Sequence, residues 1–323
     1  MTAPLLRIND LAVEFVTPDR RTTALDGVSL EVGVGEVVGL VGETGCGKTL
    51  TGLSILRLLP SSATVTRGTL EFEGRDLATL DAEEIRRIRG NRISMVFQNP
   101  ATAFNPVFTI GSQIRRVLAA HDTVRGPAAD ARIVEVFGEV GLGEPDRVLR
   151  SYPHQLSGGM LQRAMIAMAL VCRPALLIAD EPTTALDVTI AAQILRLLRR
   201  LQEDQGFSVL FITHDLGVVR TVSDRVVVLY AGRVAEDAPT ADLFRDPQHP
   251  YTRGLMGAVP RRSAHGGDLP SIPGSIPTDP GAIGGCAFAA RCPVAVERCG
   301  DERPALLPAA DRHLAACHLA RRA

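Results

Sequence analysis

The stretch VGETGCGKTL (residues 41–50) contains Lys48, the only lysine in the chain. Every other member of the 35 lysines and arginines is an arginine, so a general preference for arginine leaves this one position unexplained. An ammonium group is a compact point charge on a flexible stem, whereas a guanidinium group is a broad planar fork. We therefore predict that Lys48 occupies a tight site that accepts only the compact cation.

Lys48 belongs to the pattern G-x-x-x-x-G-K-[ST], which is typical of a phosphate-binding loop. Glycines let the backbone turn so that its N–H groups point at phosphate oxygens. Lys48 is predicted to reach the β- and γ-phosphates of a nucleotide, and the Thr49 hydroxyl to bind Mg²⁺. The predicted phosphate-binding residues are Gly42, Glu43, Thr44, Gly45, Cys46, Gly47, Lys48 and Thr49.

The flanking patterns indicate what positions this loop. Residues 35–42 (GEVVGLVG) predict a buried strand, and residues 48–59 (KTLTGLSILRLL) predict a helix with apolar spacing. A helix N-terminus aimed at the loop adds its dipole to the binding of an anion. This order of strand, loop and helix favours a phosphate site over the alternative, a glycine-rich turn that binds nothing.

A second chemical element is the run ALLIADEP (175–182), an apolar strand that ends in Asp180 and Glu181. A carboxylate at this end of a strand, beside a phosphate loop, can hold Mg²⁺ directly or through water, which is the role predicted for Asp180. Glu181 is predicted to act as general base toward an attacking water, help that is typically worth about 10²–10⁴-fold in rate. The alternative is a solvated acidic pair, which the upstream phosphate loop makes the weaker reading.

The rest of the N-terminal body predicts an alternating α/β fold. Short apolar runs that follow helical stretches indicate a mostly parallel sheet wrapped by helices. Residues 225–238 predict a hairpin that turns at Ala231-Gly232. Further strands are predicted at 5–15, 27–32, 68–74, 94–97, 174–180 and 208–214, and helices at 110–121, 129–140 and 158–170. The helical patterns between about 100 and 170 indicate a helical insertion.

Composition restricts the class of protein. At 323 residues the chain is long enough for two domains, and a formal charge of −1 gives no net attraction to nucleic acid. The longest apolar run, AMIAMALVC (164–172), is about half of what a bilayer crossing needs. No basic segment followed by an apolar segment opens the chain, so secretion is not expected. From about residue 260 the chain is rich in proline and glycine, which predicts irregular structure.

The run HQLSGGMLQR (154–163) resembles the signature of ABC-transporter ATPases. The order of the motifs from residue 5 to about 240 matches that family: phosphate loop, MVFQNP, signature, LLIADEP, TALD and FITHD. The resemblance implies an ABC-type P-loop NTPase in residues 1–245, with a RecA-like parallel sheet core, an antiparallel β subdomain and a helical subdomain at about 100–170.

The resemblance also implies roles for single residues. Gln98 is implied to contact Mg²⁺ or the attacking water, and His214 to contact the γ-phosphate. Ser157, Gly158 and Gly159 are implied to cap the γ-phosphate bound by an opposing subunit, and Asp187 is the D-loop residue. An aromatic residue usually stacks on adenine, for which Phe15 is the candidate, with Arg20 or Arg21 as alternatives.

The segment DPQHPYTRGLMGAVP (246–260), followed by GCAFAARCP, ERC and ACHL, resembles the C-terminal region of dipeptide and oligopeptide importer ATPases. We assign residues 246–323 to this second domain. The resemblance implies the ATP-hydrolysing subunit of a bacterial importer, bound peripherally at the cytoplasmic face of the inner membrane. Its implied partners are a second, related ATPase, two permease subunits and an extracytoplasmic peptide-binding protein. Nickel, glutathione or oligosaccharide cargo, a soluble non-transport ABC ATPase, and nucleotide binding without turnover are the alternatives.

Four of the six cysteines lie in this tail, at Cys286, Cys292, Cys299 and Cys317, with spacings C-x5-C, C-x6-C and C-x17-C. Four thiolates suit either tetrahedral zinc or a [4Fe–4S] cluster. Disulfides are disfavoured in a reducing cytoplasm, and buried thiols without metal are a further alternative. Tight C-x2-4-C knuckles, typical of zinc, are absent from this sequence, and the related importer ATPases carry an iron–sulfur centre here. We predict a [4Fe–4S] cluster with a structural role, because nothing in the sequence places these cysteines near the nucleotide.

Overall fold

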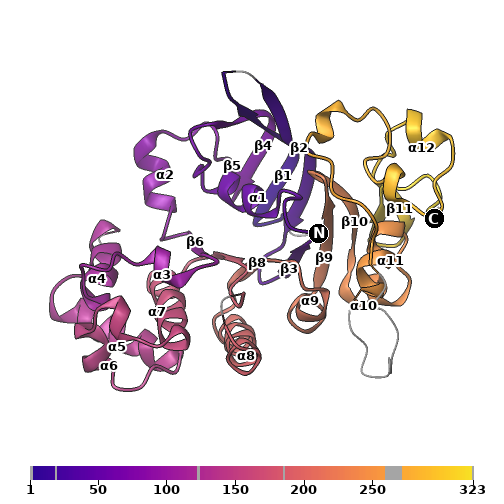
Figure 1. The fold of residues 1–323 in the computed structure, drawn as a ribbon. Coiled ribbons are helices and arrows are strands. Elements are labelled where there is room, and N and C mark those ends of the chain that lie inside the picture. Colours follow the sequence, from indigo (N-terminus) through magenta and orange to yellow (C-terminus); the bar gives the residue numbers. More distant parts are fainter. Residues whose placement is uncertain (1–2, 19, 122–123, 185, 259–270, 322–323) are drawn as a thin grey trace. The chain divides into compact units, whose positions relative to one another are not determined.

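The computed structural model describes residues 3–18, 20–121, 124–184, 186–258 and 271–321 (Figure 1). The chain divides into two compact units, and each is described by itself. The first unit comprises residues 1–79 and 211–323, and the second unit comprises residues 80–210.

The first unit contains a four-stranded antiparallel sheet in the order β2-β1-β4-β5. Its strands are β1 (Leu6–Val16), β2 (Arg21–Val32), β4 (Ala63–Phe72) and β5 (Arg75–Asp76). The pairing of β1 with β2 shifts register between Ile8 and Leu11, and both of these side chains are fully buried. Such a bulge adds a residue to one strand and so lets apolar side chains on either side of it face the same core. The antiparallel β subdomain expected from the sequence is therefore present.

The parallel part of the first unit carries the phosphate loop. All five residues of β3 (Val37–Val41) are buried, and β3 runs parallel to β9 (Arg225–Tyr230). Strand β10 (Arg233–Pro239) returns antiparallel to β9. Ala231 and Gly232 join them with φ angles of 45° and 69°, as a two-residue hairpin turn of the I′ type requires. The predicted hairpin is confirmed.

Three helices complete this part of the first unit. They are α1 (Lys48–Ile55), α9 (Leu216–Val222) and α10 (Thr240–Arg245). Strand β8 (Ser208–Thr213) carries the chain from the second unit into the first, and all six of its residues are buried. Buried β-rich segments of this kind fit the predicted parallel sheet, whose strands are covered on both faces.

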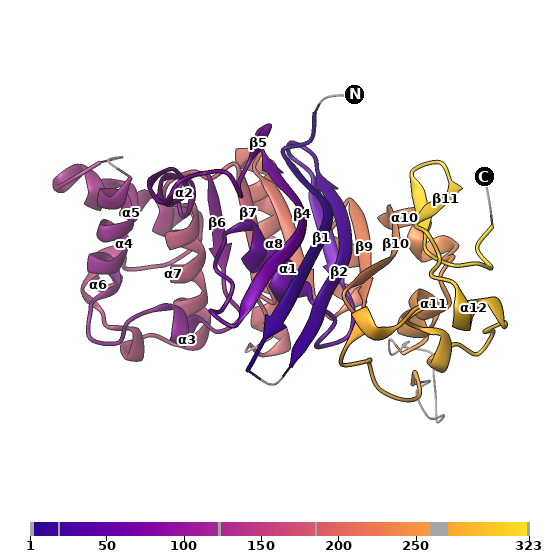
Figure 2. The ribbon, with the colours of Figure 1, turned by 90° about the horizontal axis from the view of Figure 1, so that it is seen from above.

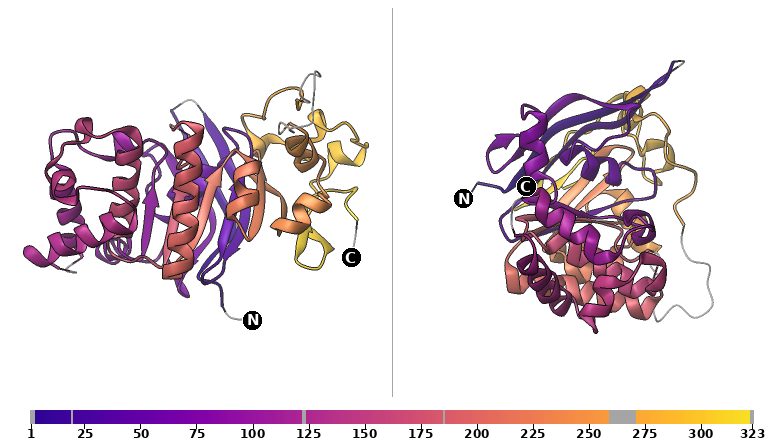
Figure 3. Two further views of the ribbon diagram at one scale, coloured as in Figure 1. Left: turned by 90° about the horizontal axis from the view of Figure 1, so that it is seen from below. Right: turned by 90° about the vertical axis from the view of Figure 1, so that its left-hand side faces the viewer.

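The second unit holds β6 (Ile93–Val96), which runs parallel to β7 (Leu176–Asp180). Its longest helix, α8 (Val188–Gln205), buries an apolar stripe of Ile194, Leu197, Leu198 and Leu201, the spacing of one helical face. Helices α4 to α7 pack on one another (Figure 3). The remaining helices are α2 (Ala82–Ile88), α3 (Pro100–Ala103), α4 (Ile110–Ala120), α5 (Pro127–Glu139), α6 (Pro145–Arg150) and α7 (Gly158–Leu170).

The tail, residues 246–323, has more regular structure than its composition predicts. Strand β12 (His313–Ala315) pairs with β11 (Leu307–Ala310) and also with β10, so the tail extends the sheet of the first unit (Figure 2). The tail also contains α11 (Pro250–Gly257), α12 (Arg298–Asp301) and the 3₁₀ turns Pro280–Ala282 and Ala289–Arg291. The described part of the proline- and glycine-rich stretch, 271–285, is irregular apart from the turn Pro280–Ala282, as predicted. Short strands form later in the tail because the open edge of β10 accepts them. Part of the proline- and glycine-rich stretch, 259–270, lies outside the described residues.

A buried hydrogen bond between His313 and Glu236 holds β12 to β10. The Nε2 atom of His313 lies 2.7 Å from Oε1 of Glu236, and the Glu236 side chain is fully buried. The same carboxylate accepts hydrogen bonds from the backbone N–H groups of Gln248 (2.6 Å) and His249 (2.9 Å). Buried carboxylates are retained only when their oxygens are satisfied in this way. Glu236 therefore joins the start of the HPY segment (residues 249–251) to strand β12 of the tail.

Candidate nucleotide-binding and hydrolysis site

The phosphate loop lies between β3 and α1, as predicted. Gly47 has a φ angle of 108°, a conformation that side chains other than glycine rarely adopt. A Cβ atom at Gly42 would lie 2.1 Å from the backbone oxygen of Leu229, so the loop is packed closely against β9. No side chain caps the N-terminus of α1 among the described residues, which leaves a helix end suited to an anion.

The Lys48 side chain lies inside the loop. It is 5% exposed, and its ammonium donates hydrogen bonds to the backbone oxygens of Gly42 (2.7 Å) and Glu43 (2.9 Å). The Sγ atom of Cys46 lies 3.9 Å from the same nitrogen. The loop therefore surrounds the cation at short range, which is the tight environment that the lone lysine predicts.

A cavity of about 500 Å³ adjoins the loop in the first unit. Phe15 lines it from the end of β1 together with Thr44 and Gly45 of the loop. Phe15 is half-buried, so its ring has a face toward this space. Arg20 and Arg21, the alternatives to Phe15, do not line the cavity. This position suits an aromatic side chain that stacks on a base while the loop holds the phosphates.

Glu181 follows β7 in the second unit. Its carboxylate accepts hydrogen bonds from Nε2 of Gln98 (2.9 Å) and from the hydroxyl of Thr184 (2.8 Å). Its backbone has a φ angle of 45°, which is uncommon outside glycine, and such strain is frequent at functional sites. Asp180, the last residue of β7, is 4% exposed. The structure thus brings the predicted base, Glu181, together with Gln98. The contact with Thr184 was not predicted from the sequence.

The signature residues begin α7 in the second unit. The Ser157 hydroxyl caps the helix by accepting from the backbone N–H of Met160 (3.3 Å). Ser157 and Gly158 are exposed, and Gly159 packs on Ile190, which would lie 3.1 Å from an added Cβ atom. An exposed helix start with two glycines presents backbone N–H groups to an anion from outside. This arrangement is compatible with the predicted contact to a nucleotide of another subunit.

The remaining candidates are Asp187 and His214. Asp187 caps α8 by accepting a hydrogen bond from the backbone N–H of Ile190 (2.9 Å), so it has a structural role in addition to its predicted one. His214 lies at the end of β8 in the first unit and is exposed. Asp215, which follows it, caps α9.

The tail contacts the phosphate loop, which the sequence did not indicate. Arg291 forms a two-pronged ion pair with Glu43, with Nη1–Oε2 and Nη2–Oε1 distances of 2.8 and 3.1 Å. These hydrogen bonds raise the pKa of Arg291. The hydroxyl of Tyr251, which is fully buried, accepts a hydrogen bond from the backbone N–H of Glu43 (2.9 Å). Tyr251 belongs to the HPY segment. Glu43 of the phosphate loop is therefore contacted both by the HPY segment and by Arg291, further along the tail.

The four tail cysteines are thiols in this structure. Among the described residues, no group of three or more His, Cys, Asp or Glu side chains is close enough to hold a metal ion. The predicted four-cysteine metal site is therefore not supported by this geometry. Arg291, the neighbour of Cys292 in sequence, contacts Glu43 of the phosphate loop.

We expect Arg291→Ala to destabilise the protein by about 1–3 kcal/mol, because it leaves the partly buried Glu43 carboxylate without its charged partner. Thermal unfolding of the intact chain measures this loss. Arg298→Ala is the matched control, since Arg298 forms a similar two-pronged pair with Glu302 on the tail surface, where both side chains are exposed. Equal melting temperatures of the two variants would contradict a role for Arg291 in holding the loop.

Comparison with known proteins places this geometry in a family. Residues 25–184 match the ABC transporter family model, and residues 235–299 match the C-terminal region of oligopeptide/dipeptide transporters. The dipeptide transport ATP-binding protein DppD of Bacillus subtilis is 47% identical over 316 residues, which cover 98% of this chain and 94% of DppD. The oligopeptide transport ATP-binding protein AppD of the same organism is 47% identical over 94% of this chain and 93% of its own.

Solved structures agree with this assignment. A dimeric ATP-binding cassette in a post-hydrolysis state with ADP and Pi superposes with a TM-score of 0.64 at 29% identity, covering 73% of this chain and 98% of that one. That cassette leaves about a quarter of this chain uncovered, and the second family model matches residues 235–299. The chain therefore belongs to the ABC transporter ATP-binding proteins, in the oligopeptide/dipeptide transporter family.

Proposed function

We propose that this protein hydrolyses ATP to power the uptake of dipeptides or oligopeptides, as a peripheral subunit at the cytoplasmic face of a bacterial inner membrane. The observation that carries the proposal is the joining of two features in one chain. One is the phosphate loop around Lys48, and the other is an HPY-containing tail that holds residue Glu43 of that loop. The first feature supports ATP hydrolysis, and the second supports the peptide-importer branch.

The proposed reaction is ATP hydrolysis with Glu181 as the base. Lys48 and the loop N–H groups bind the phosphates, and the Glu181 carboxylate takes a proton from the attacking water. The hydrogen bonds from Gln98 and Thr184 fix the orientation of that carboxylate. His214 contacts the γ-phosphate. An ordered base is effective because little reorganisation is left for the transition state.

Mg²⁺ fits the donors present. The Thr49 hydroxyl, the Asp180 carboxylate and the Gln98 amide oxygen are hard oxygen ligands, which Mg²⁺ prefers. Asp180 is almost fully buried at the end of β7. When bound, Mg²⁺ neutralises the charge that develops on the phosphates.

The exposed signature implies that hydrolysis needs a dimer. Ser157, Gly158 and Gly159 complete the site of an opposing ATPase subunit, and Asp187 follows at the same interface. ATP then holds the two subunits together until its cleavage loosens them. We propose a related second ATPase, two permease subunits and an extracytoplasmic peptide-binding protein as partners. No helix among the described residues is long and apolar enough to cross a membrane, and we propose that the permeases supply the pathway.

Membrane purification of the tagged chain tests this function. We expect two permeases and a second ATPase to co-purify, and the complex in vesicles to take up peptides only with ATP and the binding protein present. Uptake of nickel, glutathione or an oligosaccharide in place of peptide would show that the same importer machinery carries a different cargo. Co-purification with ribosomal or DNA-repair proteins alone would overturn a transport function.

We also propose a domain boundary near residue 245 and a metal centre at Cys286, Cys292, Cys299 and Cys317. The support for the centre is electrostatic. Burial raises the pKa of the Cys286 thiol, and the other three thiols act in the same direction. The backbone N–H of Cys286 also donates to the backbone oxygen of Cys299 (2.8 Å). A [4Fe–4S] cluster spans a wider set of thiolates than a single zinc ion does, and zinc is the alternative.

Protein purified without oxygen is expected to be brown and to carry about four irons per chain, as ligation of a cluster by four cysteines implies. Cys299→Ser should remove the colour and the iron, while Cys172→Ser, outside the tail, should leave both unchanged. Metal analysis and visible absorption measure the result. Stoichiometric zinc without iron would show that the centre holds zinc and no cluster. The absence of both metals would reject the proposed metal centre.

A further inference from the structure

The cavity beside the phosphate loop has a wall made by the tail. Residues Ile276, Pro277, Thr278 and Pro280 line it together with Phe15. These residues are more than 200 positions from the loop in sequence, yet they share with it a cavity of about 500 Å³. Three of the four are apolar. The cavity is therefore bounded by an aromatic ring from β1 and by apolar side chains from the tail.

The wall is fixed to β2 directly. The Asp279 carboxylate accepts a hydrogen bond from the backbone N–H of Thr23 (3.3 Å), and Nη2 of Arg20 lies 3.6 Å from its second oxygen. Gly281 packs so closely on β2 that a Cβ atom there would lie 2.3 Å from the hydroxyl oxygen of Thr23. Only a glycine permits this approach, so the turn Pro280–Ala282 has one defined position against β2.

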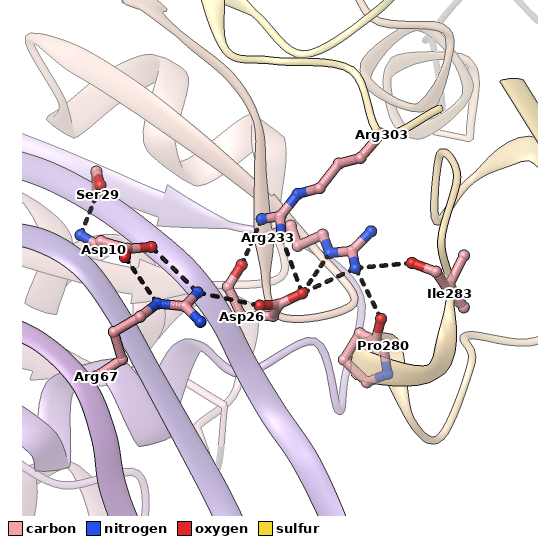
Figure 4. Close-up of polar contacts among 8 residues, drawn as sticks. All are labelled: Asp10, Asp26, Ser29, Arg67, Arg233, Pro280, Ile283 and Arg303. Carbon is pink, nitrogen blue, oxygen red and sulfur yellow. Dashed lines mark hydrogen bonds and ion pairs between the residues drawn. The ribbon is translucent and has the colours of Figure 1, made fainter. Parts of the chain in front are cut away.

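Arg233, which is mostly buried, also holds this turn (Figure 4). Nη2 of Arg233 donates to the backbone oxygens of Pro280 (2.8 Å) and Ile283 (3.0 Å). Arg233 is itself bound to the Asp26 carboxylate at 2.8 and 3.0 Å, and Arg303 of the tail lies 3.1 Å from that carboxylate.

Asp26 is charged in this network. Burial alone raises the pKa of Asp26, but its hydrogen bonds and ion pairs with Arg233, Arg303 and Arg67 outweigh burial and lower it. Arg67 also joins Asp26 to Asp10 on β1 (Figure 4). Charge-assisted hydrogen bonds of this kind are the strong ones, so the wall is anchored to all three long strands of the antiparallel sheet.

We propose that Ile276, Pro277 and Thr278 contact the base and ribose of bound ATP opposite Phe15, so that the tail helps to determine nucleotide affinity. The proposal rests on the ATPase function above. A purine has two apolar faces and gains most when both are covered. Phe15 and the apolar side chains of the tail line the same cavity.

The test compares two glycine substitutions in the intact chain. Gly281→Ala places a methyl group against Thr23 and pushes the wall away, whereas Gly284→Ala meets no atom within 4 Å. We expect Gly281→Ala to raise the Kd for ATP about tenfold, as loss of apolar contact with a base implies, and to leave the Kd for inorganic tripolyphosphate within about twofold. Gly284→Ala should change neither. Isothermal titration calorimetry measures both ligands.

Ile276→Ala keeps the test valid if Gly281→Ala does not fold, because it removes wall surface without a clash. It should weaken ATP binding and spare tripolyphosphate binding in the same way. Unchanged ATP affinity in both variants would overturn the proposal, and so would equal losses for ATP and tripolyphosphate, which would indicate damage to the phosphate loop. Failure of the wild-type chain to bind ATP at all would instead overturn the ATPase function on which the proposal rests.

Discussion

Glu181→Gln is expected to keep ATP binding and to lose turnover by about 10²-fold or more, because the amide cannot accept the proton of the attacking water. The substitution is close to isosteric, so the contacts from Gln98 and Thr184 to the side-chain oxygen can persist. The variant should also accumulate as an ATP-bound dimer, since binding across the interface continues after hydrolysis has stopped. ATPase rates of the assembled complex and size-exclusion chromatography with ATP measure the two effects.

Glu203→Gln is the matched control for this experiment. Glu203 lies on α8 of the same unit, where its exposed carboxylate pairs with Arg199. It should leave turnover and dimer formation unchanged. If Glu181→Gln retained turnover within a few fold of the wild type, the general base would have to be another residue.

Lys48→Arg is expected to lower hydrolysis by about 10²-fold although it preserves charge, because a misplaced group at the reacting phosphate costs that much. The Lys48 ammonium fits within hydrogen-bond distance of the Gly42 and Glu43 carbonyl oxygens, and the side chain is almost fully buried. A planar guanidinium has no room in that position without displacing the loop. ATP titration and steady-state ATPase rates separate a loss of binding from a loss of catalysis.

Arginine-to-lysine exchange on the surface gives the control, since it makes the same chemical change in the opposite direction. Arg87→Lys suits this purpose, because Arg87 is exposed on α2 and forms an ion pair with Glu83. Its ATPase rate should equal that of the wild type. Equal activity of Lys48→Arg would show that only charge matters at this position and would remove the steric explanation for the lone lysine.

Much of the candidate site follows from local sequence. The phosphate loop, the strand that ends in Asp180 and the hairpin turn at Ala231-Gly232 each depend on a few adjacent residues whose spacing sets backbone conformation. Such patterns can be recognised in the sequence because strands, helices and turns depend mainly on residues that are close together along the chain. The roles of Gln98, Ser157 and His214 came from the resemblance to a family and remain proposals for this chain.

Sequence patterns predict the phosphate loop, the α/β core and the resemblance to peptide-importer ATPases. The contacts between the tail and the phosphate loop become visible only in the folded chain. Arg291 is one of 35 cationic residues, and nothing near it in sequence selects Glu43, which is 248 positions away. Likewise, the fit of Gly281 against Thr23 and the pairing of β12 with β10 depend on surfaces that exist only after the sheet has formed. Long-range partners are chosen by shape and charge in the folded chain, and for that reason local patterns do not reveal them.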